Sequence, residues 1–201
     1  MEITSAVGAV LGAFGLSGAA GLNAWLPLFV VGVADRMGWI DLGQPYHWLS
    51  STLVLAGIAV LLVVDLVCDK IPAVDSAIHA LGTVIAPTSG GILFAADTSL
   101  NAHVPTAVAA VLGAVVAGGV HVGRSTSRPL VTGTTAGVGN PVVSILEDVS
   151  SMALTVLALV VPIAAFVVVV ALLIGLGWLG FRAVRWARSR RNGRRVEPSV
   201  E

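Results

Sequence analysis

Long runs of apolar residues alternate with short polar segments along this chain. The apolar runs cover roughly 5–34, 49–67, 76–96, 104–122 and 141–181. A helix needs ~20 predominantly apolar residues to cross the hydrocarbon core of a bilayer. The pattern therefore predicts an all-α, polytopic bundle of transmembrane helices.

The last run is too long for one crossing. As a single helix it would reach about 60 Å, twice the hydrocarbon thickness. Pro162 lies near its middle and is the natural turn point, which gives helices over 141–160 and 163–184 and six spans in total. Two alternatives remain: a short re-entrant segment near 141–152, and a run 76–96 that only dips into the membrane.

Composition supports the membrane prediction. The chain is 56% hydrophobic and 11% charged, whereas soluble domains average about 25% charged residues. Its mean hydropathy is +0.95. Residues 1–184 are expected to form one transmembrane domain and 185–201 a disordered basic tail that contacts anionic lipid. No aromatic or motif context accompanies the basic residues, so no nucleic-acid partner is expected.

The distribution of basic residues predicts the orientation. Seven of the 11 Lys and Arg residues lie from Arg182 to Arg195, and such clusters are retained on the cytoplasmic side. With six spans, both termini are then cytoplasmic, Lys70, Arg124 and Arg128 lie inside, and Arg36 lies outside. If 76–96 only dips, Arg36 and Lys70 exchange sides.

Several spans carry residues that interrupt helices. Three glycines precede Asn23 and Pro27, the segment 87–91 reads Pro-Thr-Ser-Gly-Gly, and Asn140 is placed to cap a helix that starts at Pro141. Free helix ends within a membrane are tolerated when they are buried in protein or line a cavity. The alternative is that the glycines serve only close helix packing.

Weak self-similarity suggests a duplicated plan. The segment 17–23 resembles the segment 135–140, and each leads into an apolar helix. Three spans per half would give an inverted repeat of the kind found in many transporters.

A polar stripe runs along the predicted helix over 141–160. Its members are spaced four, four, three and four residues apart, which places them on one helix face. Asp148 belongs to the stripe, and Glu147 lies about 100° to one side. These two acids are the only charged residues between Arg128 and Arg182. The stripe consists of Asn140, Ser144, Asp148, Ser151 and Thr155.

A carboxylate at membrane depth costs several kcal/mol, so it normally faces a protein interior or wet cavity and has a function. We interpret Asp148 as a proton or cation site, or as an acid that grips a substrate. The alternative is a structural ion pair that fixes this helix to a loop. The cations available near that face are Arg124, Arg128 and Lys70.

A second polar cluster follows the span 49–67. Asp65 and Asp69 share a helix face, and Asp75 and His79 have the same spacing. An Asp/His pair is compatible with proton or metal handling. Because no third ligand lies near in sequence, helix capping by Asp75 and ion pairing with Lys70 are favoured over a metal site.

Several segments resemble an uncharacterised bacterial membrane-protein family, the domain of unknown function 4126. The resemblance implies a polytopic protein of the bacterial inner membrane, with these motifs at its functional centre and no known activity. One departure is Ala86, where an arginine is expected before Pro87. The resembling segments are 69–76, 17–28, 121–128, Asn140-Pro141, Ser144 and Glu147-Asp148.

These patterns favour a small carrier or permease for a small organic ion or a lipid headgroup, with acidic coupling residues and no cofactor. One alternative is a membrane enzyme that acts on lipid or prenyl phosphates through Asp65 and Asp69. Another is a non-catalytic assembly protein, for which a filled, ion-paired core at Asp148 would argue. The candidate binding residues are Asn23, Asp69, Lys70, Asp75, His79, Arg124, Arg128, Asn140, Ser144, Glu147, Asp148 and Ser151.

Overall fold

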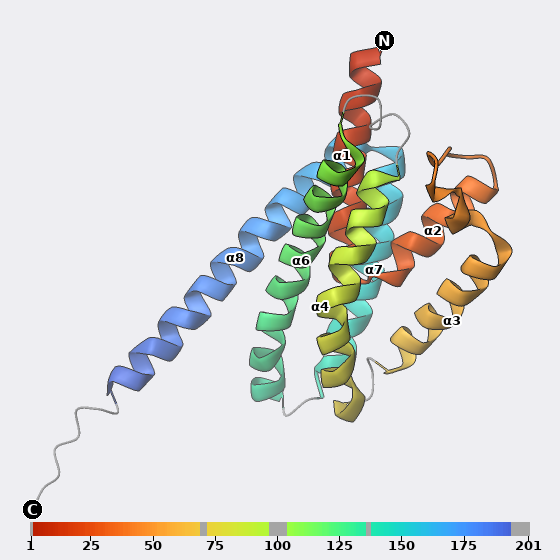
Figure 1. Cartoon of the computed structure of the whole chain (residues 1–201). Helices are drawn as coiled ribbons and strands as arrows, with labels where there is room; N and C mark the ends of the chain where they lie inside the picture. Colours follow the sequence, from red (N-terminus) through yellow and green to blue (C-terminus); the bar gives the residue numbers. More distant parts are fainter. Residues whose placement is uncertain (1, 69–71, 97–103, 136–137, 194–201) are drawn as a thin grey trace, which may run out of the picture.

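The computed structural model describes residues 2–68, 72–96, 104–135 and 138–193, and these form a bundle of helices (Figure 1). The predicted all-α class is confirmed. The helices in chain order are α1 (Glu2–Leu22), α2 (Trp25–Arg36), the 3-10 helix η1 (Tyr46–Ser50), α3 (Thr52–Cys68), α4 (Pro72–Ala95), α6 (Thr106–Thr135), α7 (Asn140–Val160) and α8 (Pro162–Gly193).

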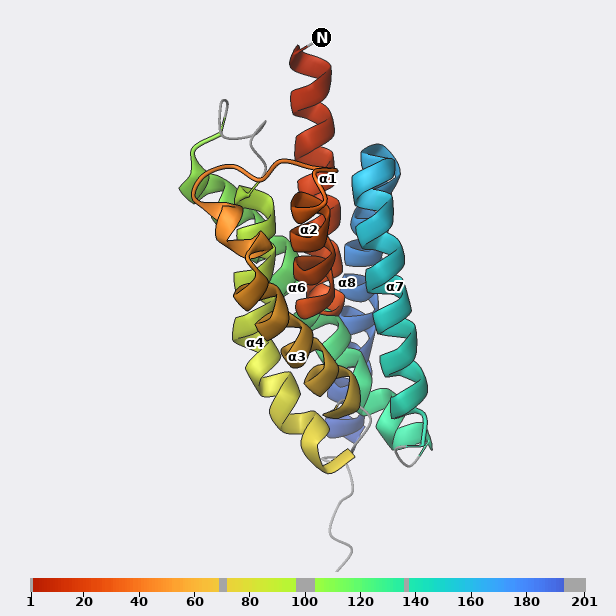
Figure 2. The same ribbon diagram turned by 90° about the vertical axis from the view of Figure 1, so that its right-hand side faces the viewer.

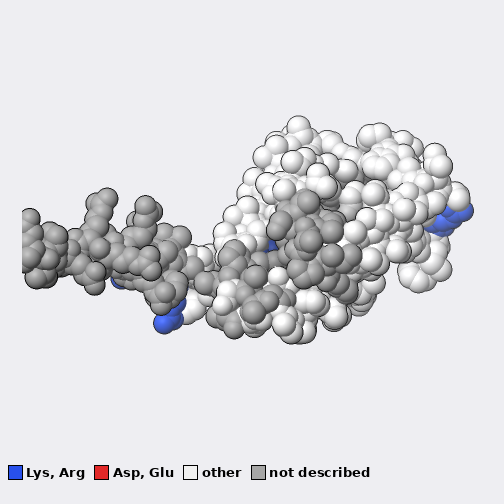
Figure 3. Space-filling model, turned by 90° about the horizontal axis from the view of Figure 1, so that it is seen from below, with Lys and Arg blue, Asp and Glu red and all other residues white. Residues whose placement is uncertain are grey.

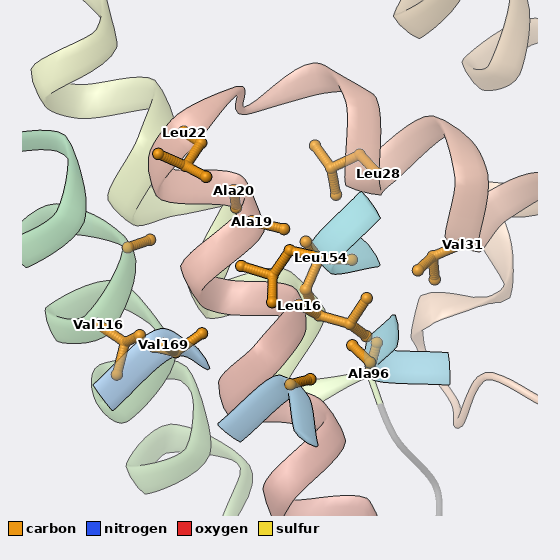
Figure 4. Packing of buried hydrophobic residues seen from close by; sticks show 14 of the residues in the cluster. Leu16, Ala19, Ala20, Leu22, Leu28, Val31, Ala96, Val116, Leu154 and Val169 are labelled. Carbon is orange, nitrogen blue, oxygen red and sulfur yellow. The ribbon is translucent and has the colours of Figure 1, made fainter. Parts of the chain in front are cut away.

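Helix α1 is the centre of the bundle and packs against α4, α6, α7 and α8. Figure 4 shows Leu16 and Leu154 meeting on one side of α1, with Val169 close to another. Glycine lets these helices approach closely. A Cβ on Gly15 would lie 2.7 Å from the Cβ atoms of both Ala158 and Ala165. Close packing therefore accounts for this glycine without any ligand.

The first apolar run is not a single helix. Helix α1 ends partway along the bundle, and α2 turns back toward the end at which α1 starts (Figures 1 and 2). Because of this reversal, α1 begins and α8 ends at opposite ends of the bundle. The prediction that both termini are cytoplasmic counted 5–34 as one crossing, and the side of the membrane on which each terminus lies stays a prediction.

Three further predictions concern where helices begin and end. The predicted division at Pro162 is confirmed, because α7 ends at Val160 and α8 begins at Pro162. The interruption predicted at 87–91 is wrong, since α4 continues through Pro87 to Ala95. The cap of α7 also differs: Gly139 occupies that position and Asn140 is the first helical residue.

The outer surface of the bundle is apolar. Within the described residues, three helical segments are long and apolar enough to cross a membrane: Thr106–Thr126, Asn140–Val160 and Pro162–Arg182. Shorter apolar helices lie over Ala6–Leu22, Thr52–Cys68 and Ala80–Ala95. Large side chains such as Leu53, 85% exposed, point away from the protein. Water would penalise this surface, whereas lipid matches it.

The crossing of α4 and α6 yields a stability prediction. A Cβ on Gly113 would collide with the carbonyl oxygen of Gly90, and neither backbone can move aside cheaply. We expect Gly113→Ala to destabilise the protein by about 1–3 kcal/mol, the usual cost of overpacking. Thermal unfolding in detergent measures this. Gly57→Ala is the matched control, because a Cβ there meets nothing within 4 Å; equal melting of both variants would contradict the packing argument.

Candidate functional site

Asn23 occupies the break between α1 and α2 and joins two acids from distant parts of the chain. Its side-chain nitrogen donates to Asp65 Oδ2 at 3.0 Å and to Asp148 Oδ1 at 2.9 Å. Its side-chain oxygen accepts from the backbone N–H groups of Trp25 and Leu26, both at 3.1 Å. Asn23 is only 2% exposed. One amide therefore starts α2 and also links it to α3 and α7.

The orientation of this amide follows from its partners. Backbone N–H groups can only donate, so the side-chain oxygen must face them and the nitrogen must face the carboxylates. Both N–H bonds are then used, one for each acid. The two carboxylate oxygens are thus held near each other by a neutral donor. Such an arrangement favours a proton or another cation, because adjacent carboxylates repel.

The polar stripe on α7 places Asp148 beside this break. Asn140, Ser144, Ser151 and Thr155 are all buried, which confirms that this helix face is turned into the protein. The Ser151 hydroxyl donates to the carbonyl oxygen of Ala19 at 2.9 Å. This bond fixes α7 against the last turn of α1, one helical turn from Asp148.

Glu147 points to a different partner. Its Oε2 lies 2.9 Å from Nη1 of Arg124 on α6, and the two side chains are 11% and 13% exposed. Glu147 thus forms an ion pair with α6, whereas the structural ion pair considered from the sequence concerned Asp148 and a loop. Arg124 Nη2 also lies 3.5 Å from His121 Nδ1, whose Nε2 is 3.4 Å from the Ser125 hydroxyl. His121 is 1% exposed, and donation by arginine requires Nδ1 to be unprotonated.

A cavity of about 120 Å³ adjoins these groups. Asp65 and Arg124 contribute its charged side chains, and Trp25 and Gly82 form part of its wall. A Cβ on Gly82 would lie 2.5 Å from His121 Cε1, so glycine here makes room for the imidazole. The remaining lining is apolar and comes from α3, α4 and the start of α2.

Acidic side chains outnumber basic ones among the described members of this cluster. Asp65, Glu147, Asp148 and Arg124 provide three carboxylates and one guanidinium, a formal net charge of −2. In Figure 3, which views the bundle from below, no described carboxylate reaches the visible surface. Because low-polarity surroundings strengthen charge interactions, a bound cation would be stabilised here more than in water.

Five predicted binding residues lie wholly or in their side chains outside the described residues. Asp69 and Lys70 lie outside the described residues, as do the side chains of Asp75, His79 and Arg128. From the sequence, Asp65 was given a role only in the enzyme alternative and was not among the candidate binding residues. In the structure, its carboxylate accepts a hydrogen bond from Asn23. Its spacing four residues before Asp69 gave no signal of this contact.

Another polar cluster, formed by Asp35, Asp41 and His47, lies where α2 ends, beyond the run 5–34. The backbone N–H of Leu42 donates to Asp35 Oδ1 at 2.9 Å, and His47 Nδ1 lies 3.4 Å from Asp35 Oδ2. Burial acts to raise the pKa of Asp35, but hydrogen bonds from Ser50, Leu42 and His47 lower it below its ordinary value. His47 was not among the residues singled out from the sequence. It is about half exposed but faces two carboxylates, those of Asp35 and Asp41.

The apolar helices, outward hydrophobic side chains and buried polar centre define a helical protein embedded in a membrane. The model of the family "Domain of unknown function (DUF4126)" matches residues 10–182. The chain belongs to this family, as the sequence resemblance indicated. No curated protein and no solved structure matches the chain.

Proposed function

We propose that this protein is a small carrier whose cation-binding acids are Asp148 and Asp65. The observation that carries the proposal is the Asn23 amide, which holds carboxylates from α3 and α7 at a broken helix. Carriers commonly place coupling-ion sites where transmembrane helices are interrupted. Asn23 lies at such an interruption, because α1 ends before it and α2 begins after it.

The substrate class is a small organic cation or the amine-bearing part of a lipid headgroup. The adjoining cavity of about 120 Å³ has room for several water molecules. Asp65 can pair with an ammonium group, and Trp25 offers an aromatic face beside it. A proton and the substrate amine would compete for the negative charge of these acids. Such competition is the basis of coupled exchange.

The expected orientation places the end of α8 in the cytoplasm. Arg182 and Arg185 lie on α8, while Arg36 ends α2 near the end of the bundle at which α1 starts. Basic residues near the ends of spans are retained inside. With this orientation, Arg36 lies on the outer face of the bacterial inner membrane.

Asp148→Asn tests the coupling role. The amide oxygen of the new side chain can still accept from Asn23, so the fold should persist while the negative charge is lost. We expect at least about a tenfold drop in substrate-driven proton flux, which corresponds to about 1.4 kcal/mol. The assay uses liposomes with a trapped pH-sensitive dye, to which methylammonium, ethanolamine and choline are added in turn.

The control is Thr88→Ala, because Thr88 is exposed and its hydroxyl donates to the carbonyl oxygen of Val84 on its own helix. It should transport like the parent. Parent-level flux in Asp148→Asn would remove the coupling role. Flux no greater than that of empty liposomes for the parent, with all three amines, would refute the carrier.

One observation favours an assembly protein as the second candidate. The surroundings of Asp148 are already hydrogen-bonded, and the cavity is lined by Asp65, without Asp148. A filled polar core of this kind can simply fix the positions of α1, α3 and α7. In that case Asp148→Asn would leave every flux unchanged, while Asn23 variants would still unfold at lower temperature.

A further inference from the structure

Three metal-ligating side chains converge where α2 ends and the following loop begins, away from the Asn23 site. Asp35, Asp41 and His47 each offer one ligand atom, and these atoms all lie within 4.8 Å of one another. The His47 ring lies between the two acids, with Nδ1 3.4 Å from Asp35 Oδ2 and Nε2 3.5 Å from Asp41 Oδ1.

The distances suit a transition metal. Zinc binds imidazole nitrogen and carboxylate oxygen at about 2.0–2.2 Å, so neighbouring ligands of a tetrahedral site lie about 3.4 Å apart. The separation between His47 Nδ1 and Asp35 Oδ2 is 3.4 Å. A single metal uses one ring nitrogen, so the Asp41 side chain, which is 79% exposed, must turn about its Cα–Cβ bond to join Asp35 at the same nitrogen.

Asp35 is already held in place for this role. Its side chain is only 5% exposed, although it carries a carboxylate. One oxygen accepts from the backbone N–H of Leu42, which leaves the other directed at His47. A ligand whose second oxygen is hydrogen-bonded has a fixed orientation, as supporting contacts provide in metal sites.

We propose that Asp35, Asp41 and His47 form a binding site for a divalent transition metal, of which Zn²⁺ is the best fit. The mixed nitrogen and oxygen donors favour zinc over Ca²⁺ and Mg²⁺, which prefer oxygen ligands. Three protein ligands leave a fourth position for water. The metal joins the end of α2 to η1, because Asp35 lies on α2 and His47 on η1.

The test uses the full chain in detergent, stripped with a chelator and then titrated with ZnCl₂, CaCl₂ or MgCl₂. Calorimetry gives affinity and stoichiometry, and thermal unfolding gives the stabilisation. The titration is made at about pH 7.5, where an ordinary histidine is unprotonated. We expect one zinc ion per chain with micromolar affinity, a raised unfolding midpoint, and no comparable effect of calcium or magnesium.

Two ligand variants and one control separate this site from other zinc-binding groups of the chain. His47→Gln and Asp41→Asn should each weaken zinc binding at least about tenfold. Gln44→Ala lies in the same loop, is exposed and offers no ligand, so it should bind like the parent. Undiminished zinc affinity in His47→Gln would overturn the proposal. So would a parent that mild acid stabilises but zinc does not, because the cluster would then be an ion pair of protonated histidine.

Discussion

Asn23→Ala should lower the free energy of unfolding by about 4–7 kcal/mol. The variant removes two hydrogen bonds to charged groups, each worth about 1.5–3 kcal/mol. It also removes the side-chain oxygen that starts α2, a contribution of about 1 kcal/mol. Two carboxylates then face each other without the donor between them. Denaturant or thermal unfolding in detergent, followed by circular dichroism, measures the loss.

Asn23→Asp separates the two roles of this side chain. A carboxylate can still accept from the N–H groups of Trp25 and Leu26, so the start of α2 is preserved. It cannot donate to Asp65 and Asp148 while ionised, and it adds a third negative charge. We therefore expect Asn23→Asp to be at least as destabilised as Asn23→Ala at neutral pH. A variant as stable as the parent would mean that only the helix start matters.

Much of the architecture could be predicted because membrane helices coincide with apolar runs in the sequence. The break before α8 was predictable from Pro162, where proline removes a backbone donor. The reversal at Asn23 was harder to predict. A glycine-rich, apolar run of this length fits one tilted span as well as two helices, and only the contacts of α2 with its neighbours select the second arrangement. Pro87 shows the converse, since α4 tolerates a proline within its length.

The side chains that one helix contributes to the site were predictable, but the contacts between helices were not. The spacing of Asp148 and Ser151 fixed which face of α7 turns inward, because helical periodicity relates residues within a single element. No such rule relates Asp148 to Asp65 or Glu147 to Arg124, which are far apart in sequence. The adjacent acids 147 and 148 also proved to have different partners, as their separation of about 100° around the helix permits.

Breaking the Arg124–Glu147 pair should also lower the free energy of unfolding by several kcal/mol. Both side chains are largely shielded from solvent, and removal of one partner from such a pair typically costs about 3–5 kcal/mol. We expect both Arg124→Gln and Glu147→Gln to be destabilised, and the double variant to recover most of the loss. A double-mutant cycle of unfolding free energies measures the coupling. Arg36→Gln is the control, because Arg36 is exposed and bonds to Thr52 and Ser50.

The two single variants should not be equal. Arg124→Gln leaves three carboxylates of the described cluster without their guanidinium, so its formal charge falls from −2 to −3. Glu147→Gln raises that charge to −1, and the freed guanidinium can turn toward Asp65, which lines the same cavity. Arg124→Gln is therefore expected to be the less stable of the two. The reverse order would mean that the local charge of this cluster is not its dominant energy, and the case for a cation site would fail with it.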